Sequence, residues 1–193
     1  MLYDNTQFIL LLSKYCKINK DEYFREKLYQ TIEFIKKEFS NKNELLGSAY
    51  DADSDGEEGK YYVYSYNDIK DIRDISDYFE LDEKGNWENK IILVEKKKPP
   101  KEILEKLFEI RLKKNKPFFD DKTQLDLNCL WISGLISAHD ILPQKGYLKL
   151  AETFFINIEN NYLKKNIQHS YSKEIVFLED YALSLIHISE PTR

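Results

Sequence analysis

The stretch Asp21-Glu-Tyr-Phe-Arg-Glu-Lys-Leu-Tyr-Gln-Thr-Ile-Glu-Phe-Ile-Lys-Lys-Glu-Phe39 decides the fold class. Its apolar side chains recur every three to four positions, which is the spacing of one face of an α-helix. These side chains are Phe24, Leu28, Ile32, Ile35 and Phe39. Asp21 directly precedes the apolar run and can cap the helix. The sequence therefore predicts an amphipathic helix that buries one face.

A similar helix is expected directly before this one, over residues 6–17, with Asn5 or Asp4 as its cap. The connection of residues 18–20 is so short that the two helices must run antiparallel, as a helical hairpin.

The second half of the chain repeats this pattern. We predict helices over residues 101–115, 122–142 and 147–163, and Gly146 separates the last two into another hairpin. Pairs of antiparallel helices without a strict sequence repeat favour a toroid over a regular array. The expected fold class is mainly α: a partial (α/α)6 toroid of helical hairpins with a small β insertion.

The insertion follows a glycine-rich, acidic segment at residues 47–59. Residues 60–66 and 91–94 are rich in β-branched and aromatic side chains, which predicts two short strands. Ser65 or Asn67 can cap a brief helix between them.

Composition excludes several classes of function. The 193 residues are 42% hydrophobic and carry a net charge of −5 with both signs mixed, which is typical of a soluble globular protein and unlike a nucleic-acid-binding one. No apolar run reaches the ~20 residues of a membrane helix. Cys16 and Cys129 form no disulfide framework or metal motif, and we read them as small buried apolar residues. We expect a cytoplasmic protein with no metal, cofactor, nucleic-acid or membrane partner.

Both ends of the chain look like boundaries of a longer protein. Residues 183–193 match the translation of a sequencing-library adapter, so we set them aside, and His187 with them. Met1 is the only methionine, and the chain enters a helix within a few residues. We expect residues 1–182 to be an interior piece of a larger protein.

Four stretches carry a family resemblance. They are Met1-Leu-Tyr-Asp-Asn5, the acidic run Asp51 to Gly59 followed by Tyr61, Tyr62 and Val63, the run Arg111 to Pro117 followed by Asp120, Asp121, Lys122 and Asn128, and Leu178-Glu-Asp-Tyr-Ala182. In this order they resemble the thioredoxin-domain-containing proteins related to spermatogenesis-associated protein 20.

The resemblance covers residues 1–182 and implies a toroid like those of six-hairpin glycosidases and N-acylglucosamine 2-epimerases. It also implies a thioredoxin-like domain that precedes the toroid, is missing from this chain and would be its partner. Two departures are Tyr64, where the family usually has Trp, and Leu125 to Cys129, where it usually has Thr-x-Trp-Asn-Gly.

The implied function is carbohydrate-related, either glycoside hydrolysis or sugar epimerisation, with a carbohydrate or another small molecule as ligand. Paired carboxylates would divide the acid and base roles, and aromatic rings would stack on the sugar. The catalytic candidates are Asp51, Asp53, Asp120, Asp121 and Asp180. The substrate-binding candidates are Tyr3, Asp4, Asn5, Glu57, Glu58, Tyr62, Lys122, Asn128 and Glu179.

The same residues can also have purely structural roles. The acidic residues near helix starts can serve as caps, and His139 and His169 are given no catalytic role. Asp51, Asp53, Asp55 and Glu57 can instead hold a structural calcium ion, although Tyr62 occupies the position of the closing glutamate of an EF-hand loop. The competing function is a non-catalytic binding module with a structural acidic loop.

Overall fold

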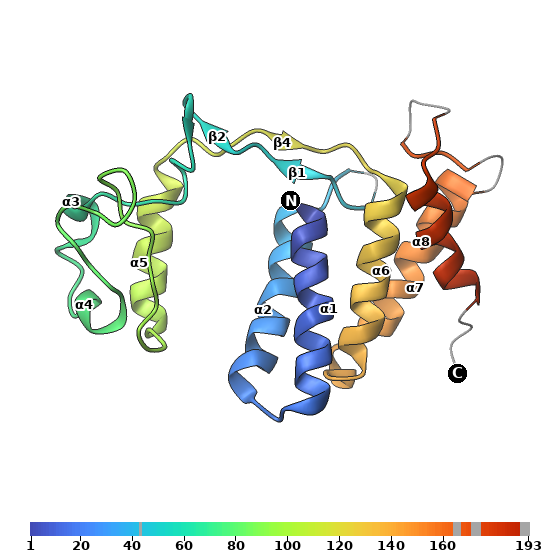
Figure 1. Ribbon diagram of the computed structural model, residues 1–193, viewed down its shortest axis with the longest axis horizontal. Helices are drawn as coiled ribbons and strands as arrows, with labels where there is room; N and C mark the ends of the chain where they lie inside the picture. Colours follow the sequence, from blue (N-terminus) through green and yellow to red (C-terminus); the bar gives the residue numbers. More distant parts are fainter. Residues whose placement is uncertain (43, 164–166, 171–174, 190–193) are drawn as a thin grey trace. The chain divides into compact units, whose positions relative to one another are not determined.

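A computed structural model of the chain describes residues 1–42, 44–163, 167–170 and 175–189. The chain is mainly helical, as predicted, and divides into two compact units (Figure 1). Unit 1 is built from residues 1–49 and 119–193, and unit 2 is the intervening segment 50–118. The sequence predicts a single domain over residues 1–182. The structure instead gives the insertion, residues 50–118, a compact body with a core of its own.

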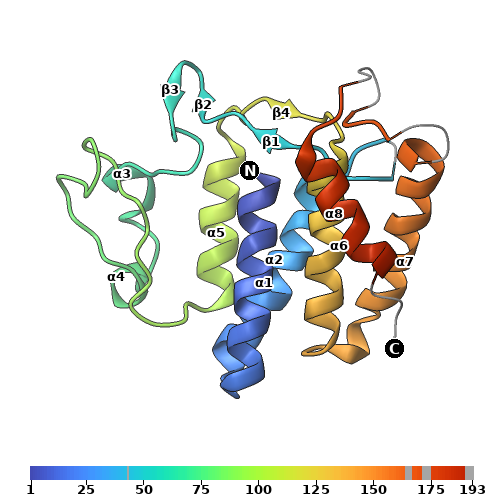
Figure 2. The same ribbon diagram turned by 45° about the vertical axis from the view of Figure 1, so that its right-hand side comes forward.

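Unit 1 consists of helices arranged as hairpins. The first pairs α1 (Leu2–Ile18) with α2 (Glu22–Glu38), and the second pairs α6 (Leu125–His139) with α7 (Tyr147–Ile158). A further helix, α8 (Leu178–Ser189), packs against α6, and α6 also packs against α1. Figures 1 and 2 show the first turns of α1, α6 and α8 at the same end of unit 1.

Helix α6 forms the centre of unit 1 and is buried along most of its length. Trp131 is fully buried, and its ring meets Phe154 of α7 edge-on with 6.0 Å between centroids. Gly134 lets α1 approach α6 closely, because a Cβ there would lie 3.2 Å from Cγ2 of Thr6 and 3.4 Å from Cγ2 of Ile9. The close contact of these two helices therefore depends on a residue without a side chain.

The predicted helices are present, with shifted ends. Asp21 caps α2 as expected, since its Oδ1 accepts a hydrogen bond from the Tyr23 backbone N–H at 2.9 Å. The prediction that Asp4 or Asn5 caps the first helix is wrong: α1 begins at Leu2, and Asp4 lies within its first turn. The carboxylate of Asp4 is 3.1 Å from the Met1 ammonium instead.

Two connections in unit 1 follow local sequence. The α6–α7 loop is a 3-10 turn, Pro143–Lys145, and ends at Gly146, whose φ of 70° suits glycine. Helix α7 is followed directly by a π-helical turn, Glu159–Leu163, which matches the predicted helical extent of 147–163. Helix α8 continues through residues 183–189, which the sequence analysis had set aside, while residues 190–193 and the side chain of His187 lie outside what is described.

Unit 2 packs three short helices around an isoleucine-rich core. These are α3 (Tyr66–Ile69), α4 (Ile75–Tyr78) and α5 (Lys101–Leu112). The core consists of Tyr64, Ile69, Ile72, Ile75, Phe79, Ile91, Ile103 and Leu107. Ser65 caps α3 as predicted, and it forms a reciprocal capping box with Asp68.

The strands of the insertion differ from the predicted ones. The predicted strands at 60–66 and 91–94 are wrong: they reduce to one antiparallel residue pair, Tyr64 with Ile91, which exchange both backbone hydrogen bonds. The reason is that a turn takes up residues 59–62 and Ser65 caps α3, so Tyr64 alone is left to pair with Ile91.

Short strands form elsewhere. β2 (Asp53–Ser54) and β3 (Glu57–Glu58) make an antiparallel hairpin inside the acidic segment, turned by Asp55 and Gly56 at φ 54° and 74°. β1 (Ala49–Tyr50) pairs with β4 (Phe119–Asp120).

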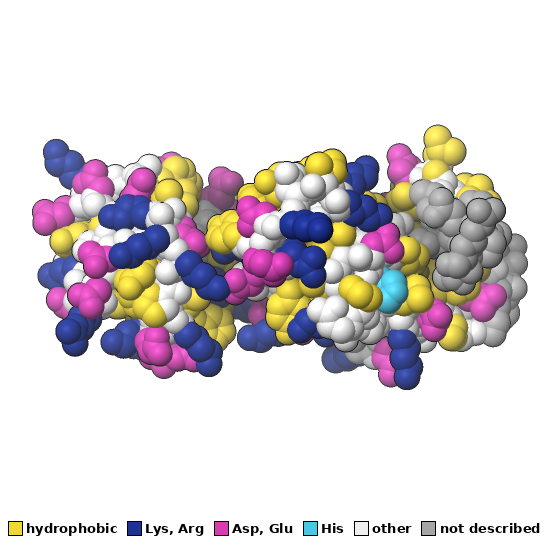
Figure 3. Space-filling model, turned by 90° about the horizontal axis from the view of Figure 1, so that it is seen from below, with side chains coloured by type: hydrophobic (Ala, Val, Ile, Leu, Met, Phe, Trp, Pro, Cys, Tyr) yellow, Lys and Arg dark blue, Asp and Glu magenta, His cyan; other side chains and the backbone are white. Residues whose placement is uncertain are grey.

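The charged surface is mixed. On the face shown in Figure 3, basic and acidic side chains are interspersed, without a large patch of either sign. None of the described helices combines the length and the apolar composition that crossing a bilayer requires.

Both cysteines are buried in unit 1, as predicted, and this gives a simple test of its packing. Burial raises the pKa of the Cys129 thiol to about 12, and burial also raises the pKa of Cys16. At pH 8 the thiolate of Cys129 is then about one ten-thousandth of the total. We expect an aromatic disulfide reagent to label the native chain at least about a hundredfold more slowly than the urea-unfolded chain. Rapid labelling of both thiols without denaturant would contradict this packing.

Candidate functional sites

The residues nominated from sequence fall into two groups, one in each unit. Unit 1 holds Tyr3, Asp4, Asn5, Asp120, Asp121, Lys122, Asn128, Glu179 and Asp180, and unit 2 holds Asp51, Asp53, Glu57, Glu58 and Tyr62. We therefore consider each unit by itself.

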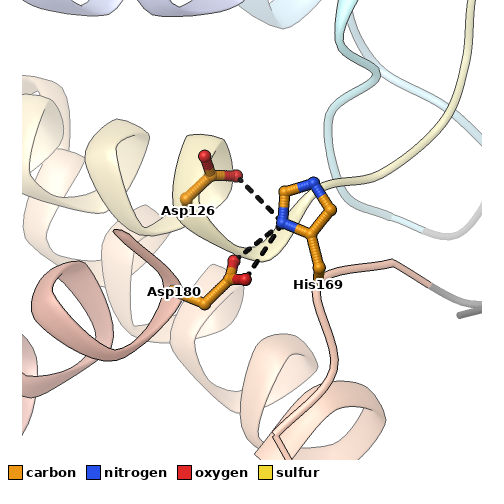
Figure 4. A group of neighbouring side chains, drawn as sticks. All are labelled: Asp126, His169 and Asp180. Atoms are coloured by element: carbon orange, nitrogen blue, oxygen red, sulfur yellow. Dashed lines mark hydrogen bonds and ion pairs between the residues drawn. The ribbon is translucent and has the colours of Figure 1, made fainter. Parts of the chain in front are cut away.

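In unit 1, one nominated residue belongs to a cluster of three titratable side chains (Figure 4). Asp126 lies in the first turn of α6, Asp180 in the first turn of α8, and His169 in the segment 167–170. Nδ1 of His169 is 3.0 and 3.1 Å from the two carboxylate oxygens of Asp180 and 3.9 Å from Oδ1 of Asp126. Figure 4 shows both carboxylates directed at the same ring nitrogen. We call this group the Asp–His–Asp cluster.

Backbone pairing brings the three side chains together. Gln124, just before α6, forms a β-bridge with Ser170, and the Leu125 N–H donates to the carbonyl of His169 at 2.9 Å. At the start of α8, the Phe177 N–H donates to Oδ2 of Asp180 at 2.9 Å, as acidic residues in a first helical turn commonly accept. The His169 ring meets Phe177 edge-on at 4.7 Å. The imidazole is therefore held from both sides.

The cluster is poorly solvated. Asp180 is fully buried, and the side chains of His169 and Asp126 are 15% and 18% exposed. Burial raises the pKa of Asp126, and the Asp180 charge raises it further, against the opposing effects of the Leu127 N–H and of His169. Asp126 therefore keeps its proton to a higher pH than a surface aspartate does.

No protein-family model matches the chain, and no curated protein gives a significant sequence match. We therefore argue the chemistry of both units from their own residues.

Asn128, nominated as a substrate-binding residue, lies fully buried in unit 1. Its Oδ1 accepts from the Leu46 N–H at 2.9 Å, and its Nδ2 donates to the Leu46 carbonyl at 3.1 Å and to the Gln124 carbonyl at 2.9 Å. The amide thus ties the segment before β1 to the first turns of α6. Because both side-chain atoms of Asn128 already bond to backbone groups, the amide serves the fold and is not directed at a ligand.

The other nominated residues of unit 1 are partly or fully exposed. Asp120 accepts from the Lys122 N–H at 3.3 Å and forms an ion pair with the Lys122 ammonium at 3.1 Å. Tyr3 and Asn5 lie on the first turns of α1, Asp121 precedes α6, and Glu179 lies next to Asp180 in α8. Among the nominated residues of unit 1, only Asp180 joins the Asp–His–Asp cluster.

In unit 2, Glu57 and Glu58 line a pocket of about 290 Å³. The strand β3 presents them, and the turn after it contributes Lys60. The far wall includes Trp87, Lys90 and Lys114. Gly59 lies beneath the Trp87 ring, since a Cβ there would be 3.5 Å from its Cη2. Tyr62 is 47% exposed and does not belong to the lining.

The charges around the pocket are only partly paired. Lys60 bonds to Glu57 at 2.8 Å, which lowers the pKa of Glu57 and raises that of Lys60. Lys114 donates to the carbonyl of Val63, and desolvation lowers its pKa. Among the described residues, Glu58 and Lys90 have no side-chain hydrogen bond or ion pair, so both remain available to a ligand.

The acidic segment does not gather its carboxylates around one point. Asp55 accepts from the Asn115 amide at 2.8 Å and lies 3.6 Å from Lys60, which Glu57 also binds. Asp51 accepts from the Asp53 N–H at 3.3 Å. Within the described chain, the donor set compact enough for a metal ion is the Asp–His–Asp cluster. Lys60, the Asn115 amide and a backbone N–H therefore bind three of the four carboxylates that suggested calcium, those of Asp51, Asp55 and Glu57.

Sequence reasoning did not nominate Asp126, His169 or the lysines and tryptophan of the pocket. One signal was present: Asp126 and Asp180 occupy first turns of helices, as Asp4 does. First-turn acids of parallel helices share one end of a bundle, so these positions could have been grouped. His169 lies in a polar stretch without periodicity and offers no comparable signal.

Proposed function

We propose that this chain is a carbohydrate-binding module, built from part of an (α/α)6 toroid, that holds a sugar-sized ligand in the pocket of unit 2. The observation that carries the proposal is the combination, around one small pocket, of the Trp87 ring with Glu58 and Lys90, whose side chains pair with no other described residue. The domain that the module would contact is the thioredoxin-like domain of the longer protein that the family resemblance implies. The two free cysteines fit a reducing compartment, so we place the protein in the cytoplasm.

The helix contacts of unit 1 support the toroid. In such a ring the first helices of successive hairpins contact each other, and each second helix packs on its own first helix. Here the first helices α1, α6 and α8 contact one another in sequence, while α2 packs on α1 and α7 packs on α6. Apolar residues also remain exposed on the outer members, among them Leu11 and Ile18 on α1 and Leu178 and Leu185 on α8. Further hairpins of a ring would cover such residues.

The pocket suits a sugar by its chemistry. An aromatic ring offers an apolar face to the C–H groups of a pyranose, while carboxylates accept from hydroxyl groups and ammonium groups donate to ring and hydroxyl oxygens. Trp87, Glu58 and Lys90 supply one group of each kind. A volume of about 290 Å³ lies just below the usual range of ligand pockets and suits a single sugar ring.

Binding is favoured over catalysis because three of the five carboxylates nominated as catalytic are already engaged, and the other two, Asp53 and Asp121, belong to different units. Asp51 accepts from a backbone amide, Asp120 pairs with Lys122, and Asp180 is fully buried against His169. Hydrolysis or epimerisation requires carboxyl groups that face the substrate. Of the nominated acids, Glu58 is the one that lines a pocket without a partner of its own.

Intrinsic fluorescence offers a direct test. The chain has two tryptophans: Trp131 is fully buried, while Trp87 is partly exposed in the pocket wall, so a ligand in the pocket changes the emission of Trp87. We expect glucose, N-acetylglucosamine, maltose or cellobiose to give a saturable change with a dissociation constant of about 0.1–10 mM. Glu58→Gln and Trp87→Ala, the latter followed by calorimetry, should each weaken binding about tenfold.

The matched control is Glu83→Gln, an exposed acid of unit 2 outside the pocket lining, which should bind like the wild type. Proton NMR of the same sugar samples detects new anomers or cleaved products and so separates catalysis from binding. If none of the four sugars changes the emission, or if Glu58→Gln and Glu83→Gln behave alike, the proposed pocket is refuted.

A further inference from the structure

The ring of His169 is anchored on the side away from the carboxylates. Its Nε2 lies 2.8 Å from the side-chain amide of Gln124, and that amide is in turn 2.7 Å from the hydroxyl of Ser48. The Ser48 hydroxyl is also 2.6 Å from the carbonyl of Lys122. These contacts form one hydrogen-bonded chain that ends at a backbone carbonyl.

The protons of this chain can be counted. With the Gln124 oxygen toward Ser48, the single hydroxyl proton of Ser48 faces two acceptors, the Gln124 oxygen and the Lys122 carbonyl. One of the two short contacts is then left without a proton. With the amide rotated by half a turn, the Gln124 NH₂ donates to Ser48, and Ser48 donates to Lys122. Every contact in the chain then has one donor and one acceptor.

The rotated amide determines the state of His169. It places the Gln124 oxygen at Nε2, so Nε2 must carry a proton and donate it. In the neutral ring the other nitrogen, Nδ1, then has only a lone pair. This lone pair faces both oxygens of Asp180 at 3.0 and 3.1 Å and Oδ1 of Asp126 at 3.9 Å. The Nδ1 lone pair and the carboxylates of Asp180 and Asp126 therefore face one another, and all three are electron-pair donors.

Such an arrangement needs a cation between the donors. Asp180 is fully buried, and none of the ion pairs among described side chains joins a lysine or arginine to Asp180 or Asp126. Backbone N–H groups at the two helix starts donate to oxygens that also face His169, Oδ1 of Asp126 and Oδ2 of Asp180, but they bring no full positive charge. The occupant is either a proton, on Nδ1 or on one of the two carboxyl groups, or a metal ion.

The geometry points to a divalent metal ion held by Asp126, His169 and Asp180. Its donors are one imidazole nitrogen and carboxylate oxygens, a set that suits Zn²⁺ or Mn²⁺. Ligands about 2.1 Å from a metal are about 3.0–3.4 Å apart when adjacent, which the His169–Asp180 separations match. Asp126, the most exposed of the three, has to move inward by about 1 Å to complete the set.

The second shell agrees with a metal site. A ligating histidine usually donates its other N–H to a fixed acceptor, which sets the tautomer and the orientation of the ring. Gln124, backed by Ser48 and Lys122, provides this acceptor. Three protein ligands leave coordination positions open for water or for a small ligand. This site lies wholly in unit 1 and is independent of the proposed sugar pocket.

Calorimetric titration of the whole chain with ZnCl₂ and MnCl₂, without any sugar, tests the inference. We expect one ion per chain, a dissociation constant of about 10 μM or lower for Zn²⁺, and a higher melting temperature of the loaded protein. His169→Gln should weaken binding at least about a hundredfold and Asp126→Asn about tenfold. Nitrogen-15 NMR of the metal-free chain should show the His169 proton on Nε2, and metal should shift Nδ1.

His139→Gln is the matched control, because His139 lies at the opposite end of α6 and is outside the cluster. It should bind metal like the wild type, and circular dichroism should show that the three variants remain folded. The inference is overturned if binding is not saturable at one ion per chain. It is equally overturned if His169→Gln binds as the wild type does, or if nitrogen-15 NMR shows Nδ1 protonated and unaffected by metal. Loss of sugar binding in unit 2 would leave these results unchanged, so the two proposals fail separately.

Discussion

Replacing Trp131 with alanine is expected to lower the free energy of unfolding of unit 1 by about 3–5 kcal/mol. The side chain is fully buried in the middle of α6 and packs edge-on against Phe154 of α7. Its removal leaves a cavity at the helix that contacts α1, α7 and α8 together. Because an ordinary domain is stable by about 5–15 kcal/mol, this single change removes a large share of the total. Urea unfolding followed by far-ultraviolet circular dichroism measures the effect.

Two controls separate packing from other causes. The Nε1 atom of Trp131 is buried without a hydrogen-bond partner among the described residues, so Trp131→Phe removes an unsatisfied donor along with some volume. We expect Trp131→Phe to cost less than about 1.5 kcal/mol. Trp87→Ala, in the pocket wall of unit 2, should leave the unfolding of unit 1 unchanged. A Trp131→Ala chain that unfolds at the wild-type urea concentration would show that α6 is not the core of unit 1.

Replacing Asn128 with alanine is expected to cost about 2–4 kcal/mol, because it leaves two buried backbone groups of Leu46 without partners. Each such group costs about 1–3 kcal/mol when its hydrogen bond is lost. The sequence hypothesis that Asn128 binds substrate predicts a different result: a small change in stability and a loss of sugar affinity. Denaturant unfolding and the sugar titration, carried out on the same variant, distinguish the two roles.

Asn157→Ala provides the comparison. The Asn157 amide makes a long bond of 3.4 Å to the exposed carbonyl of Glu44, so its loss should change stability by no more than about 0.5 kcal/mol. Equal stability of the Asn128→Ala and Asn157→Ala chains would mean that the amide of Asn128 is not structural.

Local pattern was sufficient for the helices. The apolar spacing in residues 22–38, with Asp21 before it, predicts α2 and its cap, because both depend on neighbours within one or two turns. The same holds for the Ser65 cap and for Gly146 at the α6–α7 turn. The strand predictions failed where two local signals competed. In residues 60–66, turn and cap formation at both ends left Tyr64 alone to pair with Ile91.

The candidate sites depended on contacts between distant residues. Asp180 was nominated for catalysis from its motif, yet its burial and its contact with His169 follow only from the packing of α8 on α6. Glu57 and Glu58 were nominated together, but among the described residues only Glu57 has a side-chain partner, because Lys60 turns back onto it.

The amino-acid sequence alone determined that this protein is mainly helical, where its hairpins lie and that Asp21 caps α2, because helix periodicity and capping act over a few residues. Only the tertiary structure decided that Asp126, His169 and Asp180 share one point, and that Asn128 supports Leu46 inside the protein. These pairings join segments far apart in the chain, and they form only when α6 and α8 pack together and residues 124 and 170 form their bridge. The first-turn positions of Asp126 and Asp180 indicate at most a shared end of the bundle, and no local pattern places His169 there, since the free energy that holds the three together comes from burial shared among whole helices.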